Sequence, residues 1–249
     1  MLYYSKVETL LFHLRNIRSS VLFRRLKCFC SGNVLDIGGG SFFQVVNKYK
    51  LQYDSWTIVE TLDTAFKVKS LPGCTIIAGN GCCLPFNDNT FSTIFNIQVL
   101  EHVFEPEQMV KEISRVLLPG GKAVLMVPQT SVLHHAPSHY YNFTKFWVEK
   151  VAKINELEII EYHALGGFWT SMASHLFYFI LKALRAKGYV YETNDAARSP
   201  LFYILLPFMI LFVFLSIPLC LLFGLADFKE DPNNHILVVK KTLKNNTRK

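Results

Sequence analysis

The sequence predicts an α/β fold, in which helices cover both faces of a doubly wound, mostly parallel sheet and an apolar helical insertion precedes the last strand. Two observations predict it. Short apolar runs of five to eight residues alternate with stretches of helical periodicity, which is typical of strand–helix–strand units. A segment of 25 residues, 201–225, then interrupts the alternation without one charged side chain, and a last apolar run follows it.

Seven apolar runs are the expected strands, and the glycine, proline and polar residues between them are the expected turns. After the fourth run, apolar residues recur on one helical face over 105–121, and we expect this helix to stop at Pro119-Gly120-Gly121. Other helices are expected over 41–50 and 145–155. In chain order, the predicted strands are 33–37, 56–60, 75–79, 91–98, 122–128, 157–163 and 235–241.

Charge divides the chain, whose net charge is +7 at pH 7, into a mildly acidic middle and two basic ends. Residues 1–30 carry six Lys and Arg against one acid, and residues 240–249 carry five bases and no acid. Basic ends beside an apolar segment suit an anionic membrane surface, where each nearby base contributes about 1 kcal/mol; plain solvated termini are the alternative. Because no basic stripe with interleaved aromatic residues crosses the middle, we expect no nucleic-acid partner.

These patterns divide the chain into four segments. We expect a basic amphipathic helix over 1–30, an α/β domain over 31–165 that 232–243 completes, an apolar membrane-associated insertion over 166–231, and a basic tail over 244–249. The six cysteines form no CxxC pair, so we expect reduced thiols and no metal site. The α/β domain of this membrane-associated chain is accordingly expected to face the cytoplasm.

Three arrangements are open for the apolar segment 201–225. It is long enough to cross about 30 Å of hydrocarbon, but the predicted strand 235–241 would then have to return to the same sheet. Pro207 and Pro218 should each interrupt a straight helix, and a second apolar stretch, 172–184, lies upstream. We therefore expect two kinked helices that dip into one leaflet. Packing against the domain or a partner subunit, and a single-span anchor, are the alternatives.

The glycine run after the first predicted strand indicates a ligand site. Gly38, Gly39 and Gly40 follow "VLDI" directly, and glycine lets a backbone turn sharply and a ligand approach closely. Glu60 ends the second predicted strand, where a carboxylate can accept hydrogen bonds from a ribose diol. Neither GxGxxG nor GxxxxGK[ST] is present. The pattern favours a nucleoside ligand without a pyrophosphate, and an ordinary tight turn is the alternative.

Successive motifs make residues 33–165 resemble a known family. The motifs are "VLDIGGGS", "IVE", "AGNGCCLPFNDNTFSTIFNIQVLEHV" and "KEISRVLLPGGKAVLMVP". In order and spacing they are similar to those of class I S-adenosylmethionine-dependent methyltransferases, in the small-molecule group often called type 11. The resemblance implies a Rossmann-like sheet of seven strands with the last one antiparallel, S-adenosyl-L-methionine as cofactor, and enzymatic methyl transfer.

The resemblance also implies roles for single residues. The implied cofactor-binding residues are Asp36, Gly38, Gly39 and Gly40 at the methionine end, Glu60 at the ribose, Asn80, Gly81 and Cys82 against the adenine, and Gln98 beside the methionine moiety. Three positions depart from the family pattern, one of them being Ser92, which replaces the Asp that commonly follows Phe in the fourth-strand motif. Phe42 replaces the usual last glycine of the loop and is expected to narrow the cofactor channel, and Asn80 replaces the usual acid beside the adenine.

The methyl acceptor is predicted only as a class. Transfer from a sulfonium is an in-line displacement, and a base is needed only when the acceptor must lose a proton. The loop 129–147 offers candidates for this base, His135, His139 and Tyr140, with loop packing as the alternative role. His102 in "LEHV" is expected to orient this loop. The apolar segments suggest an acceptor that is small or amphiphilic, such as a lipid-linked molecule.

Two other function classes remain as alternatives. A chain with this fold could be a non-catalytic cofactor-binding or membrane-associated interaction protein. A short-chain NAD-dependent oxidoreductase would need a Tyr-x-x-x-Lys pair on a helix. Tyr141 and Lys145 have that spacing but follow a loop that contains proline, without the rest of that family's pattern.

Overall fold

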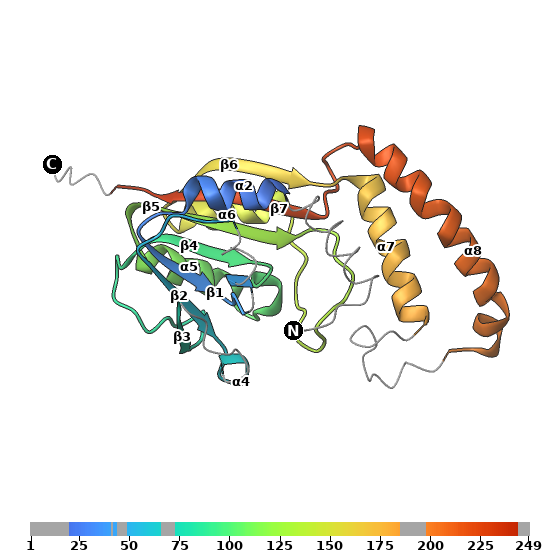
Figure 1. The fold of residues 1–249 in the computed structure, drawn as a ribbon, viewed down its shortest axis with the longest axis horizontal. Coiled ribbons are helices and arrows are strands. Elements are labelled where there is room, and N and C mark those ends of the chain that lie inside the picture. Colours follow the sequence, from blue (N-terminus) through green and yellow to red (C-terminus); the bar gives the residue numbers. More distant parts are fainter. Residues whose placement is uncertain (1–19, 41, 44–48, 66–72, 185–197, 244–249) are drawn as a thin grey trace.

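The structure is a computed structural model that describes residues 20–40, 42–43, 49–65, 73–184 and 198–243. A seven-stranded sheet runs through its centre in the order β3-β2-β1-β4-β5-β7-β6. Helices lie on both faces of this sheet, and a pair of helices projects beyond one end of it (Figure 1). The predicted α/β class, the doubly wound sheet and the apolar helical insertion before the last strand are confirmed.

The observed strands lie where the sequence predicts them. Strand β7 pairs antiparallel with both β5 and β6, and the other neighbouring pairs are parallel. The reversed last strand that the resemblance implied is therefore present. The strands are β1 (Asn33–Ile37), β2 (Ser55–Glu60), β3 (Thr75–Ala78), β4 (Phe91–Ile97), β5 (Leu117–Pro128), β6 (Leu157–Leu165) and β7 (Asn234–Lys241).

One boundary prediction is wrong. Helix α5 (Pro106–Val116) ends before Pro119-Gly120-Gly121, and β5 already begins at Leu117. Leu117 is fully buried and pairs with Phe91 of β4. A proline disfavours helical geometry at the residue before it, so the helix could not reach Pro119. The strand accommodates the extra residues through a register shift, with Gly120 at a φ of +77°.

The two faces of the sheet carry separate hydrophobic cores. Helix α2 (Ser20–Phe29) covers one face, where Val34 of β1 joins the cluster that contains Leu22 and Leu26. Leu35 joins the opposite cluster, beneath α5 and α6 (Lys145–Ile154), because successive strand residues point to opposite faces. The apolar side of α2 is thus buried on the sheet. Residues 1–19 of the predicted N-terminal helix, and most of the predicted helix 41–50, lie outside the described residues.

The insertion before β7 is a helical hairpin. Helix α7 (Phe168–Ala183) and helix α8 (Pro200–Phe223) lie side by side, and the short η3 (Gly224–Ala226) leads back toward the sheet (Figure 1). The Asp227 carboxylate accepts hydrogen bonds from the Trp169 and Thr170 amides, both at 3.0 Å, which caps the start of α7. Both helices fall within the predicted insertion, while the division of the chain into four segments stays a prediction.

The expectation that Pro207 and Pro218 interrupt the helix is wrong. Helix α8 continues through Pro207 and Pro218 without the expected interruption. Each proline removes one backbone hydrogen bond, and the rest of the helix maintains its course. The strands on either side of the insertion are neighbours in the sheet, where Leu165 of β6 pairs with Asn234 of β7. Since both ends of the insertion meet in the same sheet, a single crossing of a bilayer between them is excluded.

Candidate active site

The candidate site lies where β1, β2 and β4 end side by side. Ile37, the last residue of β1, is in register with Val59 of β2 and with Asn96 of β4. The Gly38 amide donates to the Val59 carbonyl, and the Gly79 amide donates to the Glu60 carbonyl, both at 2.8 Å. These bonds hold the loops that follow β1 and β3 against the end of β2, at one edge of the sheet. Ligands bind at this edge in open α/β sheets.

The bend after β1 has no space for side chains. Gly38 has a φ of +70° and Gly40 a φ of +45°, in the left-handed region that favours glycine. A Cβ built on Gly38 would lie 2.7 Å from Cγ2 of Val99. At Gly39 a Cβ would collide with the Asp36 carboxylate. The glycine run therefore brings bare backbone against a buried acid.

Asp36 is a buried carboxylate without a hydrogen-bond partner. The side chain is 1% exposed, and neither of its oxygens meets a donor. The pKa of Asp36 is raised to about 7, mainly by burial and then by the negative charge of Glu60, while the nearby Trp56 indole lowers it. The Trp56 indole nitrogen faces the acid yet falls short of hydrogen-bond geometry, so it also lacks a partner. A buried acid in this state is suited to receive a cationic ligand group.

Glu60 closes the other side of the bend. It is 7% exposed, and its Oε1 accepts a hydrogen bond of 2.5 Å from the Gly40 amide. Burial raises the pKa of Glu60, while the amides of Gly40 and Thr61 lower it. A carboxylate has about four acceptor positions, so the Gly40 contact leaves capacity for further donors. The structure thus brings together Asp36, the glycine bend and Glu60, as predicted from the sequence.

The residues predicted against an adenine form the turn after β3. Oδ1 of Asn80 accepts from the Cys82 amide at 2.9 Å, and Sγ of Cys82 lies 3.5 Å from the Glu105 carbonyl. Gly81 is buried, and a Cβ there would collide with the side chain of Met109. Asn80 therefore shapes its own turn through its oxygen. This turn stays attached to the bend through the Gly79 bond to β2.

The side chains of Gln98 and Phe42 each contact another residue of the protein. Gln98 follows β4 at a φ of +60°, and its side-chain nitrogen donates to Oδ1 of Asn234 at 2.7 Å. Its side chain thus joins the ends of β4 and β7. Phe42, which we expected to narrow a cofactor channel, stacks on Phe23 of α2 with ring centres 6.2 Å apart. Its ring is therefore engaged with the helix that covers this face of the sheet.

The loop after β5 is held together by its histidines. His139 accepts a hydrogen bond from the His134 amide at 3.1 Å, and its Nε2 lies 3.2 Å from the Tyr141 carbonyl. His135 is exposed at a φ of +50°, and Tyr140 is also exposed, with its ring beside that of Phe104. Of the three candidate bases, His139 thus positions the loop, whereas His135 and Tyr140 offer accessible side chains.

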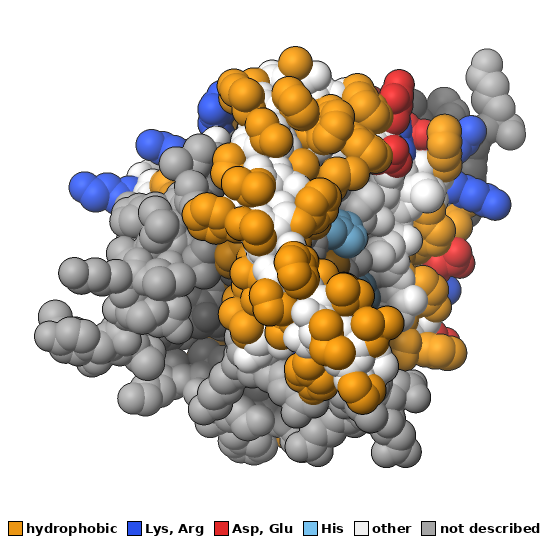
Figure 2. Space-filling view, turned by 90° about the vertical axis from the view of Figure 1, so that its right-hand side faces the viewer, with side chains coloured by type: hydrophobic (Ala, Val, Ile, Leu, Met, Phe, Trp, Pro, Cys, Tyr) orange, Lys and Arg blue, Asp and Glu red, His pale blue; other side chains and the backbone are white. Residues whose placement is uncertain are grey.

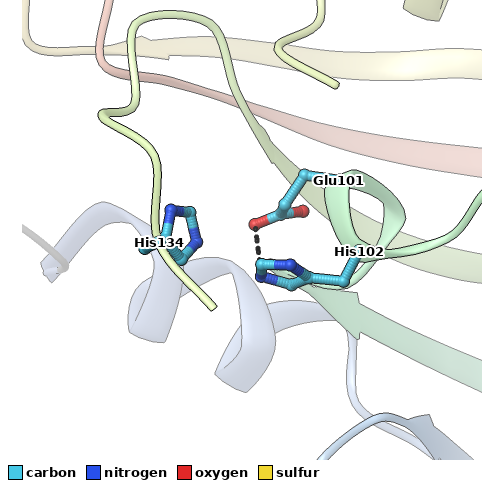
Figure 3. A group of neighbouring side chains, drawn as sticks. All are labelled: Glu101, His102 and His134. Atoms are coloured by element: carbon cyan, nitrogen blue, oxygen red, sulfur yellow. Dashed lines mark ion pairs between the residues drawn. The ribbon is translucent and has the colours of Figure 1, made fainter. Parts of the chain in front are cut away.

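Glu101 and His102 stand opposite this loop, on the short helix η1 (Leu100–His102) that follows β4. Figure 3 shows that both side chains and His134 face a common point. The ligand atoms of the three residues all lie within 4.8 Å of one another. Nδ1 of His102 is 2.6 Å from the Ser138 carbonyl, the contact expected of a residue that orients the loop. This cluster brings η1 and the loop together.

The electrostatics of this cluster are unusual. Burial raises the pKa of Glu101 to about 8. The pKa of His102 is lowered to about 4, mainly by burial. The hydrogen bond to the Ser138 carbonyl raises this pKa, and the charges of the neighbouring histidines lower it. Burial also lowers the pKa of His134. Sequence reasoning missed the importance of Glu101 and His134. The one available signal was a Glu-His pair directly after a strand, with three histidines in the next long loop.

The oxidoreductase pair does not form. The Tyr141 hydroxyl donates to the Phe104 carbonyl at 3.0 Å. Nζ of Lys145 lies 4.9 Å above the ring of Tyr162 and 3.5 Å from Oε1 of Glu149. Both groups therefore have other partners, and Tyr141 lies outside the helix that begins at Lys145. The arrangement does not fit a short-chain oxidoreductase.

Comparison with known proteins supports the resemblance. Residues 35–125 match the model of a family described as methyltransferase domain. The matched stretch contains the glycine bend, both buried carboxylates, the turn after β3 and the Glu-His pair of η1. The resemblance to class I methyltransferases is thereby confirmed over this stretch.

Relatives share parts of the chain. Norajmaline N-methyltransferase of Rauvolfia serpentina is 30% identical over 102 residues, which are 38% of this chain and 35% of the relative. A protein of Mycolicibacterium smegmatis named probable S-adenosylmethionine-dependent methyltransferase is 28% identical over 159 residues, 61% of this chain and 58% of the relative. Rice 2-methyl-6-phytyl-1,4-hydroquinone methyltransferase 2 is 31% identical over 100 residues, 38% of this chain and 29% of the relative. The chain thus spans less than two thirds of each.

Solved structures share the fold over most of the chain. The [4+2]-cyclase SpnF has a TM-score of 0.54 and 17% identity, over 91% of this chain and 80% of its own. A phosphoethanolamine N-methyltransferase of Haemonchus contortus, solved with S-adenosylhomocysteine, has a TM-score of 0.54 and 19% identity, over 92% of this chain and 53% of its own. These likenesses show the fold.

Proposed function

We propose that this chain, whose residues 35–125 match a methyltransferase domain, is an S-adenosylmethionine-dependent methyltransferase. It transfers a methyl group by in-line displacement to a small or amphiphilic acceptor, including lipid-linked molecules, at a membrane surface. The observation that carries the proposal is the bend at Gly38–Gly40, which has no side chains and is set between the buried carboxylates of Asp36 and Glu60.

The residues at the bend fit the charge and shape of S-adenosyl-L-methionine. This cofactor carries a sulfonium and an ammonium group, both positive, and the Asp36 carboxylate lacks a partner. Asp36 and the bare backbone of the bend would hold the methionine end, and Glu60 would accept from the ribose hydroxyls. Asn80, Gly81 and Cys82 would flank the adenine, with Gln98 beside the methionine moiety.

For methyl transfer, the main task of the protein is to position the cofactor and the acceptor. When bound, the cofactor supplies both the methyl group and its leaving group. The side chains of this chain therefore bind, orient and exclude water. A protic acceptor would also need a base, and His135 and Tyr140 are accessible for this task at the loop after β5. His139 would act through the loop that it positions.

The hairpin supports the proposed membrane surface. Among the described residues, Pro200–Ala226 is the one helical stretch long and apolar enough to cross a membrane. Its most apolar 18 residues have a mean hydropathy of 2.7, and only 11% of them are buried. Figure 2 shows apolar side chains covering the face that α8 presents. A helix that is apolar all round is at home in a protein core or in lipid. Since α8 is largely exposed, we propose that the hairpin enters one leaflet of a bilayer.

The hairpin also lies against the acceptor loop. Nζ of Lys182 on α7 donates to the Leu133 carbonyl at 3.0 Å. The Thr130 hydroxyl donates to Oγ of Ser171 at 2.9 Å. An amphiphilic acceptor could therefore move from lipid along α7 to the loop without crossing water. A relative named for a phytyl hydroquinone agrees with an acceptor of this class.

We place the methyltransferase domain on the cytoplasmic side of that membrane. Cys28 and Cys83 are free thiols on the surface of the protein. Free exposed thiols suit a reducing compartment. The proposal predicts that a membrane-impermeant thiol reagent labels Cys28 in broken but not in intact cells.

The same fold is compatible with a second function. A cyclase, SpnF, shares this fold, and a fold by itself does not determine chemistry. The alternative for this chain is a non-catalytic cofactor-binding or membrane-associated interaction protein with the same fold. Mass spectrometry of the purified protein distinguishes the two functions, because only an enzyme converts bound S-adenosylmethionine to S-adenosylhomocysteine when an acceptor is supplied.

Titration calorimetry with S-adenosylmethionine tests the cofactor site. We expect Glu60→Gln to bind about ten- to a hundredfold more weakly than the unchanged protein, because an amide replaces a charged acceptor of ribose hydrogen bonds. The matched control is Glu158→Gln, which removes an exposed acid of β6 and should bind normally. Equal affinities of all three proteins would refute the assignment of Glu60, and no binding by the unchanged protein would refute the proposed function.

A further inference from the structure

We infer that Glu101, His102 and His134 form a binding site for a divalent transition-metal ion such as Zn²⁺. The three residues come from two segments, η1 after β4 and the loop after β5. One ligand atom from each lies within 4.8 Å of the others, and Figure 3 shows them facing one another. The sequence, read without the structure, indicated no metal site.

The hydrogen bonds of both histidines leave the correct ring nitrogen free. Nδ1 of His102 lies 2.6 Å from the Ser138 carbonyl, and Nδ1 of His134 lies 2.9 Å from the Val132 carbonyl. A carbonyl only accepts, so each Nδ1 carries the proton. Each Nε2 then keeps its lone pair. Metal-binding histidines in proteins are oriented by this kind of bond to a carbonyl.

Glu101 supplies a buried acid that lacks a partner within the protein. Its side chain is 0% exposed, and neither carboxylate oxygen has a hydrogen-bond partner. Its Oε1 is 3.9 Å from Nε2 of His102. A buried carboxylate is costly unless a charge or donor compensates it, and coordination of a cation is one of the usual solutions. The buried Glu101 oxygens thus favour the binding of a positive ion at the centre of the cluster.

The backbone fixes this cluster from both sides. The Tyr140 amide donates to the Glu101 carbonyl at 2.8 Å, which ties the loop to η1. The His134 amide donates to Nδ1 of His139 at 3.1 Å. His139 is therefore a positioning residue for His134.

The donor set selects the kind of metal. Two imidazole nitrogens and one carboxylate suit Zn²⁺, Fe²⁺ or Co²⁺ better than Mg²⁺ or Ca²⁺, which prefer oxygen ligands. Tetrahedral bonds of about 2.0 Å place neighbouring ligand atoms roughly 3.3 Å apart, so the cluster would contract slightly on binding. Three protein ligands leave one coordination position open for water or for an acceptor oxygen.

Metal binding to the full-length chain tests this inference. Protein freed of metal by a chelator is titrated with Zn²⁺ alone and, separately, with Co²⁺. We expect one tight Zn²⁺ site and a Co²⁺ spectrum with d–d bands but no thiolate charge-transfer band. His134→Ala should weaken Zn²⁺ binding at least tenfold, since it removes one of three ligands. Glu101→Gln should do the same while it preserves the shape of the side chain.

The matched control is His175→Ala, which removes an exposed histidine of α7 and should leave Zn²⁺ affinity unchanged. A thiolate band, equal affinity of the His134 and His175 variants, or no Zn²⁺ binding would each overturn the inference. Binding of S-adenosylmethionine to the same metal-free protein is measured in parallel. The metal site and the proposed methyl transfer can thus fail independently.

Discussion

Asp36 should make cofactor binding depend on pH. Its pKa is raised to about 7 in the folded protein, mainly by burial and then by Glu60. The free protein therefore holds a proton on Asp36 below pH 7, and a cationic cofactor displaces it. We expect the affinity for S-adenosylmethionine to rise about tenfold between pH 6 and pH 8 and then to level off. Titration calorimetry in buffers of different ionisation enthalpy would also detect the proton released on binding.

The control for this prediction is Asp36→Asn. The variant should bind more weakly at pH 8 and show a much flatter profile. The free energy of unfolding should change with pH in the opposite direction to the cofactor affinity. An acid with a raised pKa favours the folded state least when it is ionised. Stability of the unchanged protein without ligand should therefore fall from about pH 4 to pH 7 relative to the variant. A profile that is equally steep in both proteins would disprove the role of Asp36.

Residues at strand ends could be predicted from the sequence, and residues that meet through loops could not. Asp36 lies one residue before the end of its predicted strand and Glu60 ends the next one, and neighbouring parallel strands end at one edge, so their proximity followed from the pattern. Glu101 and His134 are 33 positions apart, and only the path of the loop brings them together. The burial of Glu101 is likewise a property of tertiary packing, which a single sequence does not contain.

At the scale of elements, apolar runs located the strands because each run has to fill a buried strand of the sheet. The end of α5 was predicted too late, since helical periodicity continues to Leu117 while that residue pairs with β4. The continuity of α8 was also missed. Proline lowers helix propensity locally, but the uninterrupted apolar sequence on both sides of Pro207 and Pro218 remains helical.

The hairpin should determine membrane binding. Phe208, Phe212 and Leu215 lie on α8 and are 69%, 64% and 59% exposed. Replacing all three by serine removes apolar side chains that are each worth roughly 1.5–3 kcal/mol when buried. We expect flotation with vesicles of phosphatidylcholine and phosphatidylserine to weaken by at least about a hundredfold, because each 1.4 kcal/mol is a factor of about ten.

The control for the hairpin is Phe146→Ser, which alters an equally prominent aromatic residue, 77% exposed, on α6. This variant should float like the unchanged protein. Light scattering completes the test, since packing of α8 against a second copy would instead appear as a dimer that the triple variant dissociates. Undiminished flotation of the triple variant, or an equal loss with Phe146→Ser, would argue against insertion of α8 in lipid.

At the scale of the whole molecule, the last strand returns the chain to the sheet after the insertion. Strand β7 lies between β5 and β6, not at an edge, and pairs with both over its length. The domain is therefore completed only after the chain has passed through both helices of the hairpin. The position of β7 also joins the site to the core, since Asn234 at its start receives the hydrogen bond from Gln98.

Stability should accordingly depend on β7 more than its place near the C-terminus suggests. Leu237 is fully buried in the core that α5 and α6 cover. Replacing it by alanine should lower the free energy of unfolding in urea by about 2–5 kcal/mol, as for other large-to-small core changes. Leu243→Ala, at a position that is 64% exposed, should change it by less than about 0.5 kcal/mol. If the two variants unfolded at the same urea concentration, β7 would be a peripheral strand in solution, and the sheet without it would have to support the candidate site.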